Sequence, residues 1–344
     1  MFQGMSKVTV TVLLAVCFAL GLSPFWRWTW AEEVVNWKLQ SVFQTPQTLG
    51  YVNAFIENVK NKSRGKLIIK AYSSDQLVKN AGLLEAVTKG AIEIGWSTAP
   101  YNMGTIPEAA VEFGLPFTWE SWSEQKEVFH SYGVLEKLRE AYAEKGLYFL
   151  SPHPAGPFIL MTKKRLDTLD DIKGLKIRVR GMEAKIIESL GASPSAIPPA
   201  EQYMALQRGT IDGTVYVGLA LDQLKFHEVI DYVYFPAFTK PTTNLFVNLK
   251  AWNGLSEDLK RVFQESIDEI LDTMNEGYER EDALGLMRSL MQGGLKGAIR
   301  FSDADVARLR KASMAVWDEI AGKNARCKEM VDMVKKFMKE KGKM

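Results

Sequence analysis

Arg178 is the residue whose type and position best suit binding chemistry. It lies within the apolar run LKIRV at residues 175–179, which predicts a β-strand. Side chains alternate across a strand, so Lys176, Arg178 and Arg180 share one face. A guanidinium is planar and permanently charged, and its fork of hydrogen-bond donors matches a carboxylate. The spacing alone fits an anion-binding arginine and a surface arginine on an edge strand equally well.

Groups typical of catalysis are scarce. His130, His153 and His227 are the only histidines, and none has a metal-binding spacing such as HExxH. No GxSxG, GxGxxG after a strand or phosphate-binding loop is present. Cys327 lies in a charged helical segment, which favours a solvated thiol over a nucleophile. We therefore predict a protein that is not an enzyme, with no catalytic residue, no metal ligand and no cofactor.

The N-terminal segment has the pattern of a secretory signal peptide. Lys7 precedes the uncharged apolar run 8–22, and Thr29 and Ala31 provide small residues for cleavage after Ala31. This predicts export to the periplasm. The alternative is an uncleaved anchor, because the aromatic residues of 25–30 are of the kind that sit at a membrane interface.

Charge and cysteine content limit the partners of the mature chain. Lys7 and Arg27 leave with residues 1–31, so the 43 basic residues of the whole chain become 41, which equals the 41 acidic residues. A balanced charge argues against nucleic acid and anionic membrane surfaces as partners. Only Cys327 remains, so the mature chain contains no intramolecular disulfide.

Two stretches of the chain predict α/β folding. In the first, strands are expected at 37–43, 66–72 and 91–97, and helices at 47–60 and 80–89. In the second, strands are expected at 174–179, 210–217 and 245–250, and helices at 182–190 and 201–207. Gly90, Gly191 and Gly209 are predicted to end the helices that precede them. The rest is expected to be helical at 256–275, 277–292 and 303–338.

This order of elements predicts a two-lobed clamshell, in which each lobe is a mainly parallel sheet flanked by helices. The expected parts are a signal peptide (1–31), lobe I (32–155), lobe II (156–250) and a C-terminal helical region (251–344) that spans both lobes. His153 lies in the proline-rich stretch 152–157, which is expected to be a structural hinge. A ligand should lie between the lobes, at the carboxyl ends of the strands.

Polar residues at the ends of the predicted strands are the other candidate ligand contacts. Thr243 and Asn244 are expected in a loop that crosses between the lobes, and the other candidates directly follow strands. The full set of expected contacts besides Arg178 is Gln44, Thr45, Ser74, Ser97, Thr98, Tyr101, Tyr216, Thr243 and Asn244.

Several motifs resemble one known family. LDDIKGLKIRV at 169–179, LGASP at 190–194 and EQYMALQRGTIDG at 201–213 are similar to the solute-binding subunits of tripartite ATP-independent periplasmic (TRAP) transporters of the DctP type. AVTKGAIEI at 86–94 and LPF at 115–117 also fit, so the resemblance covers about residues 35–330. It implies a clamshell that closes on an organic acid and delivers it to a sodium-driven membrane permease. It also implies that Arg178 pairs with the carboxylate of the ligand.

Two departures from the family pattern narrow the expected ligand. The segment 156–162 lacks the second arginine that many dicarboxylate and sialic-acid binders carry. In the segment 212–218, Val215 and Tyr216 replace the glutamate and tryptophan of the α-keto-acid branch, so cation-assisted binding is not expected. We therefore hypothesise a monocarboxylate ligand, and a monocarboxylate with an apolar or aromatic body is one candidate. The protein is expected to act as a monomer. The alternatives are an exported ligand sensor and an exported enzyme that acts on a small organic acid.

Overall fold

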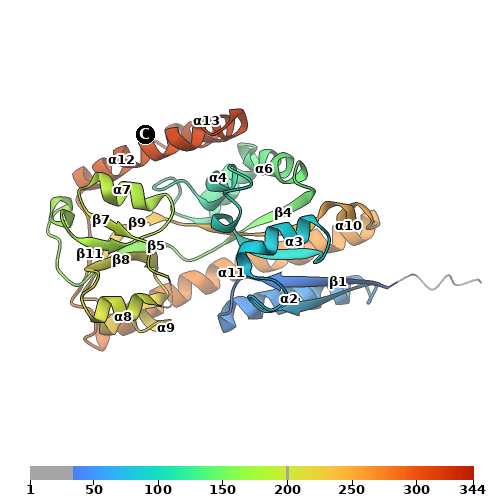
Figure 1. The fold of residues 1–344 in the computed structure, drawn as a ribbon, viewed down its shortest axis with the longest axis horizontal. Helices are drawn as coiled ribbons and strands as arrows, with labels where there is room; N and C mark the ends of the chain where they lie inside the picture. The colour runs from blue at the N-terminus through green and yellow to red at the C-terminus, as the bar shows by residue number, and fades with distance from the viewer. Residues whose placement is uncertain (1–33, 199–200) are drawn as a thin grey trace, which may run out of the picture. The chain divides into compact units, whose positions relative to one another are not determined.

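Two β-sheets form the framework of this computed structural model, which describes residues 34–198 and 201–344 (Figure 1). The first sheet has the order β2-β1-β3-β10-β4. Its strands are β1 (Val35–Ser41), β2 (Leu67–Tyr72), β3 (Ile94–Thr98), β4 (Leu147–Pro154) and β10 (Thr242–Asn248). Strand β3 runs parallel to β1, whereas β10 runs antiparallel to both β3 and β4. This sheet is therefore mixed.

The second sheet has the order β11-β9-β5-β8-β6-β7. Its strands are β5 (Phe158–Thr162), β6 (Lys176–Arg178), β7 (Ser193–Ser195), β8 (Gly213–Val217), β9 (Tyr232–Thr239) and β11 (Gly297–Arg300). Strand β6 pairs in parallel with both β7 and β8, while β5 is antiparallel to β8 and β9. The two-lobed α/β clamshell class is confirmed, with mixed sheets in place of mainly parallel ones.

Helices flank both sheets. Those between the strands of the first sheet are α2 (Pro46–Lys62), η1 (Asn80–Gly82), α3 (Leu83–Thr88), η2 (Ala99–Tyr101), α4 (Ala109–Phe113), α5 (Trp122–Lys126), the π-helix η3 (Glu127–Ser131) and α6 (Val134–Ala143). Those of the second are η4 (Leu169–Ile172), α7 (Glu183–Ser189), α8 (Gln202–Gln207), α9 (Ala220–Gln223) and η6 (Phe226–Glu228). Gly90 and Gly209 follow α3 and α8 with φ of +73° and +69°, which confirms them as helix-ending glycines.

One helix, α11 (Glu257–Met291), packs on elements of both sheets. It follows α10 (Leu249–Asn253) and contacts α2, β4 and α9. The prediction of two helices with a break near residue 276 is wrong, because the helix runs through Gly277. A methyl group at that position would lie 2.0 Å from the Tyr51 hydroxyl, so Gly277 is needed for the close approach of α2 rather than for a turn.

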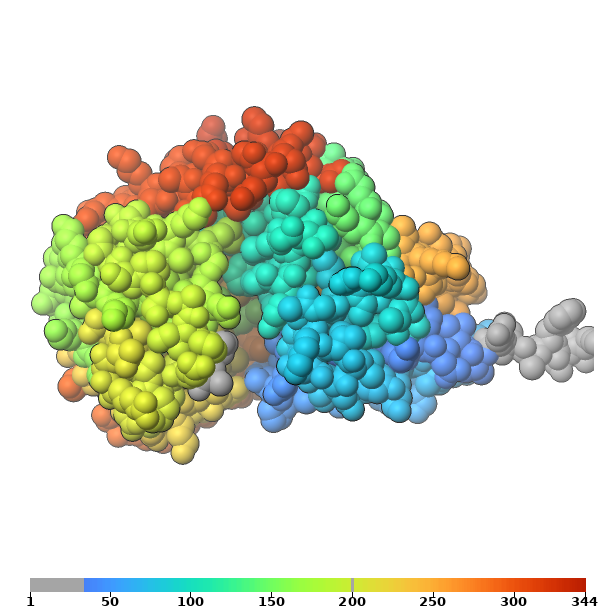
Figure 2. All heavy atoms as spheres, viewed as in Figure 1, coloured from blue at the N-terminus to red at the C-terminus, as the bar shows by residue number. Residues whose placement is uncertain are grey.

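Two C-terminal helices replace the single helical stretch expected at 303–338. Helices α12 (Asp303–Ala321) and α13 (Ala325–Glu340) begin at Ser302 and Asn324, whose side chains accept hydrogen bonds from the first-turn amides. Helix α12 packs on α7, and α13 packs on α4 and α6. Figure 2 shows their red surface running along both the yellow-green and the teal parts of the chain.

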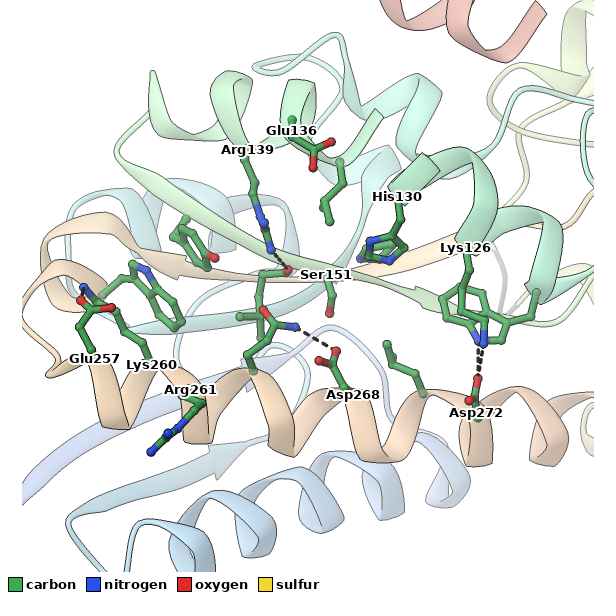
Figure 3. A pocket seen from close by; sticks show the side chains of 18 residues that line it. Lys126, His130, Glu136, Arg139, Ser151, Glu257, Lys260, Arg261, Asp268 and Asp272 are labelled. Atoms are coloured by element: carbon green, nitrogen blue, oxygen red, sulfur yellow. Dashed lines mark hydrogen bonds and ion pairs between the residues drawn. The ribbon is translucent and has the colours of Figure 1, made fainter. Parts of the chain in front are cut away.

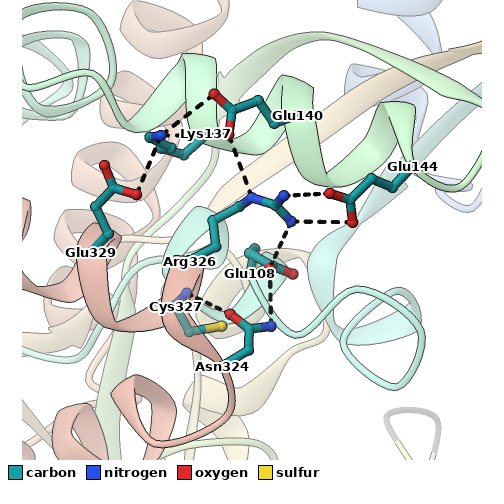
Figure 4. Close-up of polar contacts among 8 residues, drawn as sticks. All are labelled: Glu108, Lys137, Glu140, Glu144, Asn324, Arg326, Cys327 and Glu329. Atoms are coloured by element: carbon teal, nitrogen blue, oxygen red, sulfur yellow. Dashed lines mark hydrogen bonds and ion pairs between the residues drawn. The ribbon is translucent and has the colours of Figure 1, made fainter.

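An ion-pair cluster fastens α13 to the first sheet's helices. Arg326 reaches Glu108, Glu140 and Glu144 in Figure 4, and the Asn324 amide donates to Glu108. Cys327 lies beside this cluster and is fully buried, so the expectation of a solvated thiol is wrong. Burial raises the pKa of Cys327 to about 11, which keeps the thiol protonated. Cys327 is buried because it lies on the apolar side of α13, which faces the core.

Strand β10 returns the chain to the first sheet. Residues 156–250 were expected to form lobe II, yet 242–248 pair with β3 and β4 rather than with the strands of 158–239. Leu249 then begins α10, so the strand expected at 245–250 is displaced toward the N-terminus. The sequence patterns also missed β4, β5, β7, β9 and β11. The boundaries proposed for the lobes otherwise remain predictions.

Candidate ligand-binding site

Arg178 is the last residue of strand β6, which pairs in parallel with β7 on one side and β8 on the other. Its register partners are Thr214 in β8 and Ser195 in β7. Only 3% of its surface is exposed, whereas its neighbour Lys176 is exposed. Ile177 is fully buried in the main core cluster. Arg178 is therefore not a surface arginine, although its strand lies one position from the sheet edge.

The guanidinium of Arg178 is incompletely paired. Its Nε donates to the Ile197 carbonyl at 3.0 Å, and its central carbon lies 5.0 Å from the centre of the Tyr216 ring. No carboxylate forms an ion pair with it among residues 34–198 and 201–344. Burial lowers the pKa of Arg178 to about 10, with a smaller contribution from Arg180. The side chain remains charged at neutral pH and has donors available for an anion.

Aromatic rings extend from Arg178 toward the first sheet. Tyr216 lies 6.1 Å from Phe158 between ring centres, and Phe158 lies 5.8 Å from Phe113 of α4. Burial raises the pKa of Tyr216, and Tyr101 at the end of η2 adds to this rise. The structure thus groups the predicted residues Arg178, Tyr216 and Tyr101.

Thr98 and Thr243 are brought together by strand register. They are directly paired between β3 and β10, and His153 of β4 pairs with Thr243 on its other side. Thr243 lies in β10, so its placement in a crossing loop is wrong. His153 lies in β4 rather than in a hinge segment, and its burial against Trp96 lowers its pKa to about 3. The three register partners Thr98, Thr243 and His153 therefore present two hydroxyl groups and an imidazole that is uncharged at neutral pH.

Ser97 and Asn244 form the next register pair, on the opposite face of the sheet. Both are buried, and Asn244 lies in β10 rather than in the predicted loop. The Asn244 amide donates to the carboxyl group of Glu112, which also accepts from the Tyr142 hydroxyl. The Ser97 hydroxyl and the Asn244 carbonyl oxygen have no hydrogen-bond partner among the described residues. This pair faces a buried polar cluster of the first lobe.

The structure gives local roles to three further candidates, without showing a ligand contact. Thr45 is the N-cap of α2 and accepts from the Thr48 amide, and Gln44 precedes it on an exposed turn. The Ser74 hydroxyl accepts from Asn80 at 2.8 Å, which closes the loop after β2. None of these interactions joins the three to the group around Arg178, so their place as ligand contacts stays a prediction.

Asp282 is a buried acid that the sequence did not single out. It projects from α11 toward the backbone at Gly156 and Gly218: a Cβ on those glycines would lie 3.2 Å and 2.9 Å from its oxygens. Neither oxygen meets hydrogen-bond geometry with a described residue, although the Leu219 amide favours its charge. Burial raises the pKa of Asp282 to about 7, against the opposing effect of Lys240. Gly156 and Gly218 thus make room for a carboxyl group next to the segment that links β4 to β5.

Sequence patterns also missed Phe113, Phe158 and Glu112. Each lies in a run of apolar residues, where an aromatic ring predicts core packing and a single glutamate predicts an exposed position. The only available signal was Glu112 itself, an acid inside AAVEFGLPF at 109–117. Its burial reflects tertiary contacts that the periodicity does not contain.

A pocket of 980 Å³ lies elsewhere, between β4, α6 and α11 (Figure 3). Arg139 reaches down into it from α6, and Asp268 faces it from α11. Arg178 and Tyr216 are not among its lining residues. This pocket is therefore not the place where the predicted contacts gather.

Searches of the described part of the chain give two further findings. In residues 34–198 and 201–344, no helix has the length and apolarity needed to cross a bilayer. Within the same residues, no three side chains of histidine, cysteine, aspartate or glutamate are grouped as they would be to ligate a metal. The predicted signal peptide and its cleavage after Ala31 lie outside the described residues.

Comparisons with known proteins agree with this architecture. A monocarboxylate 2-oxoacid-binding periplasmic protein of Nostoc sp. is 28% identical over 316 residues, covering 89% of this chain and 85% of that protein. A TRAP periplasmic solute-binding protein of Colwellia psychrerythraea, solved with bound calcium and pyruvate, is 25% identical with a TM-score of 0.79, covering 90% and 95% of the two chains. One from Ochrobactrum anthropi reaches a TM-score of 0.81 at 23% identity, covering 90% and 96%.

The family model of the DctP proteins, described as bacterial extracellular solute-binding protein family 7, matches residues 43–324. That range includes Arg178, Tyr216 and every strand of the two sheets except β1. Proteins of this family bind solutes for transporters and are not enzymes, which confirms the prediction on catalysis. TRAP solute-binding proteins are periplasmic. The chain therefore belongs to the DctP family and is the solute-binding subunit of a TRAP transporter.

Proposed function

We propose that this protein captures a monocarboxylate with a small apolar or aromatic body, and that Arg178 pairs with the carboxylate. The observation that carries the proposal is a guanidinium 3% exposed, with one backbone hydrogen bond and no carboxylate partner among the described residues. Burying a charge without a partner is costly, so such a group is expected where a ligand supplies the opposite charge. The neighbouring rings of Tyr216 and Phe158 suit an apolar ligand body.

A single carboxylate is proposed because the buried Lys240 already has a partner, and Arg180, the other cation that acts on Arg178, is exposed. Lys240 forms an ion pair with Glu279 at 2.7 Å, and β5 contributes only apolar residues and Thr162 to this region. A second ligand carboxylate would be buried without a cation. The similarity to a 2-oxoacid-binding relative and to a pyruvate-bound one supports a ligand of this class.

The remaining parts of the proposal concern export and delivery. The mature protein begins at Glu32 after signal cleavage, acts as a monomer, and delivers its ligand to a permease driven by a sodium gradient. Lobe I covers 32–155 with β10 added, lobe II covers the rest of 156–250, and the C-terminal helices span both. Co-purification of the mature chain with the membrane subunits, dependent on the ligand, tests the delivery step.

The first experiment is a thermal-shift screen of the chain from Glu32 against small organic acids. A ligand at 100 times its Kd adds about 2.7 kcal/mol to the free energy of unfolding, which is a shift of several degrees for a chain of this size. We expect monocarboxylates, including 2-oxo acids such as pyruvate, to raise the Tm. Arg178→Ala should abolish the shift, and Arg139→Ala serves as the matched control because Arg139 also lies over a tyrosine ring.

Two results would contradict the proposal. Tight binding of C4-dicarboxylates alone would remove the single-carboxylate argument. Binding of a monocarboxylate by Arg178→Ala within about threefold of the wild type would remove Arg178 from the site. Binding without any association with membrane subunits would instead favour a ligand sensor.

A further inference from the structure

The first lobe contains a carboxyl group that is fully buried and has no basic partner among residues 34–198 and 201–344. Glu112 of α4 accepts hydrogen bonds from the Tyr142 hydroxyl at 2.7 Å and from the Asn244 amide at 2.5 Å. The Thr242 hydroxyl donates to the Glu112 backbone carbonyl at 2.6 Å. The Asn102 amide completes the cluster by donating to the Tyr142 hydroxyl at 3.1 Å. These contacts tie η2, α4 and α6 to strand β10.

The surroundings of Glu112 favour an uncharged carboxyl group. From the elements packed on α4, the titratable neighbours are Tyr142 of α6, Arg326 and Cys327 of α13, and Glu108 of α4 itself. Arg326 is paired with Glu108 rather than with Glu112 (Figure 4). Burial raises the pKa of Glu112 to about 7, and the bonds from Asn244 and Tyr142 only partly oppose this rise.

The cluster can accommodate the extra proton. A protonated Glu112 would donate to the Tyr142 oxygen across the existing 2.7 Å contact, and Tyr142 would then pass its own hydrogen to another acceptor. The Asn102 side-chain oxygen has no partner among the described residues, and rotation of its amide would turn that oxygen toward Tyr142. Every hydroxyl hydrogen of the cluster then has an acceptor, at the cost of the bond that the Asn102 NH2 group now donates to Tyr142.

This cluster lies directly behind the first lobe's share of the candidate site. Asn102 follows Tyr101, which adds to the rise that burial causes in the pKa of Tyr216. Glu112 precedes Phe113, whose ring contacts Phe158. Two short helices, η2 and α4, therefore carry a site residue and a cluster residue side by side. A shift of Glu112 along the backbone would therefore be passed to Phe113, whose ring connects through Phe158 and Tyr216 to Arg178.

We propose that Glu112 is a positioning residue for ligand capture: in its protonated form it holds Tyr101 and Phe113 toward Arg178 and Tyr216. This inference rests on the proposed function. A bound ligand packs Phe158 and, through it, Phe113 more tightly and so shields Glu112 further from water, and the complex therefore retains the proton more strongly than the free protein. By linkage, affinity for the anion falls as the pH rises through the range in which free Glu112 loses its proton.

The test is the affinity for pyruvate, measured by calorimetry between pH 5.5 and 8.5 with the mature wild type, Glu112→Gln and Glu112→Ala. Glutamine mimics the neutral acid, so we expect it to keep the low-pH affinity and to lose the pH dependence. The wild type should bind about tenfold more weakly at pH 8.5 than at pH 6. Glu112→Ala should bind weakly at every pH, because the tie to Asn244 and Tyr142 is lost.

Glu183→Gln is the matched control. Glu183 is another buried acid with a raised pKa, bonded to Thr239, and it contacts neither Tyr101 nor Phe113 in the interactions above. Its replacement should leave the wild-type pH dependence of affinity intact. A wild-type affinity independent of pH, or a Glu112→Gln affinity as poor as that of Glu112→Ala, would overturn the proposal.

Thermal stability separates this proposal from the proposed function. Wild-type Tm should fall from pH 5 to 7.5 more than that of Glu112→Gln, whether or not an anion binds, and equal slopes would show that Glu112 holds no proton. If sodium chloride, compared with choline chloride, stabilised the wild type but not Glu112→Gln, the group bound at Glu112 would be a sodium ion rather than a proton. That result would overturn the positioning role. If no anion binds the wild type at all, the proposed function fails and the positioning role fails with it.

Discussion

Arg178 and Arg139 are the same residue type in a similar local setting, with opposite consequences. Each guanidinium lies over a tyrosine, at 5.0 Å from Tyr216 and 5.4 Å from Tyr148. Arg139 donates to two backbone carbonyls, those of Phe149 and Leu150, and lines the large pocket. Arg178 donates to one carbonyl and lies in no hollow of that size.

The difference shows that unused hydrogen-bonding capacity is a better guide to a ligand site than the volume of a hollow. Around Arg139, several acids and bases of the pocket are already paired, as in the contact of Lys126 with Asp272 (Figure 3). Around Arg178, the protein supplies an aromatic face and no counter-charge among its described residues. We therefore expect the ligand at Arg178 and not at Arg139.

The largest expected effect is a double dissociation between the two arginines. Arg178→Ala should weaken monocarboxylate binding about 100-fold or more, since the ligand carboxylate would be buried without a partner. The same change should leave the free energy of unfolding nearly unaltered, because the free protein no longer buries an unpaired charge. Arg139→Ala should do the reverse, with a loss of about 1–3 kcal/mol in stability from two carbonyls left without a donor. Calorimetry measures the affinity and urea unfolding measures the free energy of unfolding. Equal losses of affinity in the two variants would show that Arg178 and Arg139 do not differ in ligand binding.

Asp282 extends the comparison to an unpaired buried charge of the other sign. Burial raises the pKa of Asp282 from 3.8 to about 7, so the folded protein holds a proton that the unfolded chain has released. Its stabilising contribution is therefore present at acid pH and is lost as the pH rises from about 4 to 7. Asp282→Asn removes this titration and should gain about 2 kcal/mol over the wild type at pH 8. Urea unfolding of both proteins at pH 5 and pH 8 checks this gain. If the difference in the free energy of unfolding between Asp282→Asn and the wild type were the same at both pH values, Asp282 would not be the group that titrates.

A smaller effect is expected from the aromatic faces beneath the two arginines. Tyr216→Leu removes the ring under Arg178 and should weaken monocarboxylate binding about three- to tenfold, the size of a partly buried cation–π contact. Tyr148→Leu removes the matching ring under Arg139 and should leave the affinity unchanged. Titration calorimetry with both variants decides the point. An unchanged affinity in Tyr216→Leu would reduce Tyr216 to a packing residue.

The smallest expected effect is that of metal removal. Val215 is 2% exposed within the core, so the position where the α-keto-acid branch carries a glutamate offers no ligand here. Treatment with EDTA and dialysis into sodium-free buffer should therefore leave monocarboxylate affinity within about twofold. A strong loss that calcium or sodium restores would show that oxygen groups outside the predicted set bind a cation.

Local sequence signals predicted much of the framework. The alternation at 175–179 correctly placed Ile177 in the core and Arg178 on the other face, because a strand has a period of two whatever packs against it. The helix-ending glycines at 90 and 209 were predicted correctly because the left-handed backbone after a helix is a local requirement. The family motifs predicted the protein class for the same reason: they are contiguous in sequence.

Pairings between distant segments were not predictable in the same way. Thr243 and Asn244 looked like loop residues because TTN has no strand pattern, yet β10 is inserted between β3 and β4 and buries both. The break expected between 275 and 277 is absent, because α11 continues through Gly277, where Tyr51 occupies the space of the missing side chain.

The sequence by itself determined the binding-protein class, the α/β framework and the face on which Arg178 lies, since these follow from periodicity and contiguous motifs. Only the tertiary structure decided that Arg178 lacks a protein counter-charge among the described residues, that Tyr216, Phe158 and Phe113 lead from it to the first sheet, and that Glu112 is buried behind them. The physical reason is that burial and charge pairing depend on which distant segments meet, and a hydrophobic pattern along one segment contains no information about its partners.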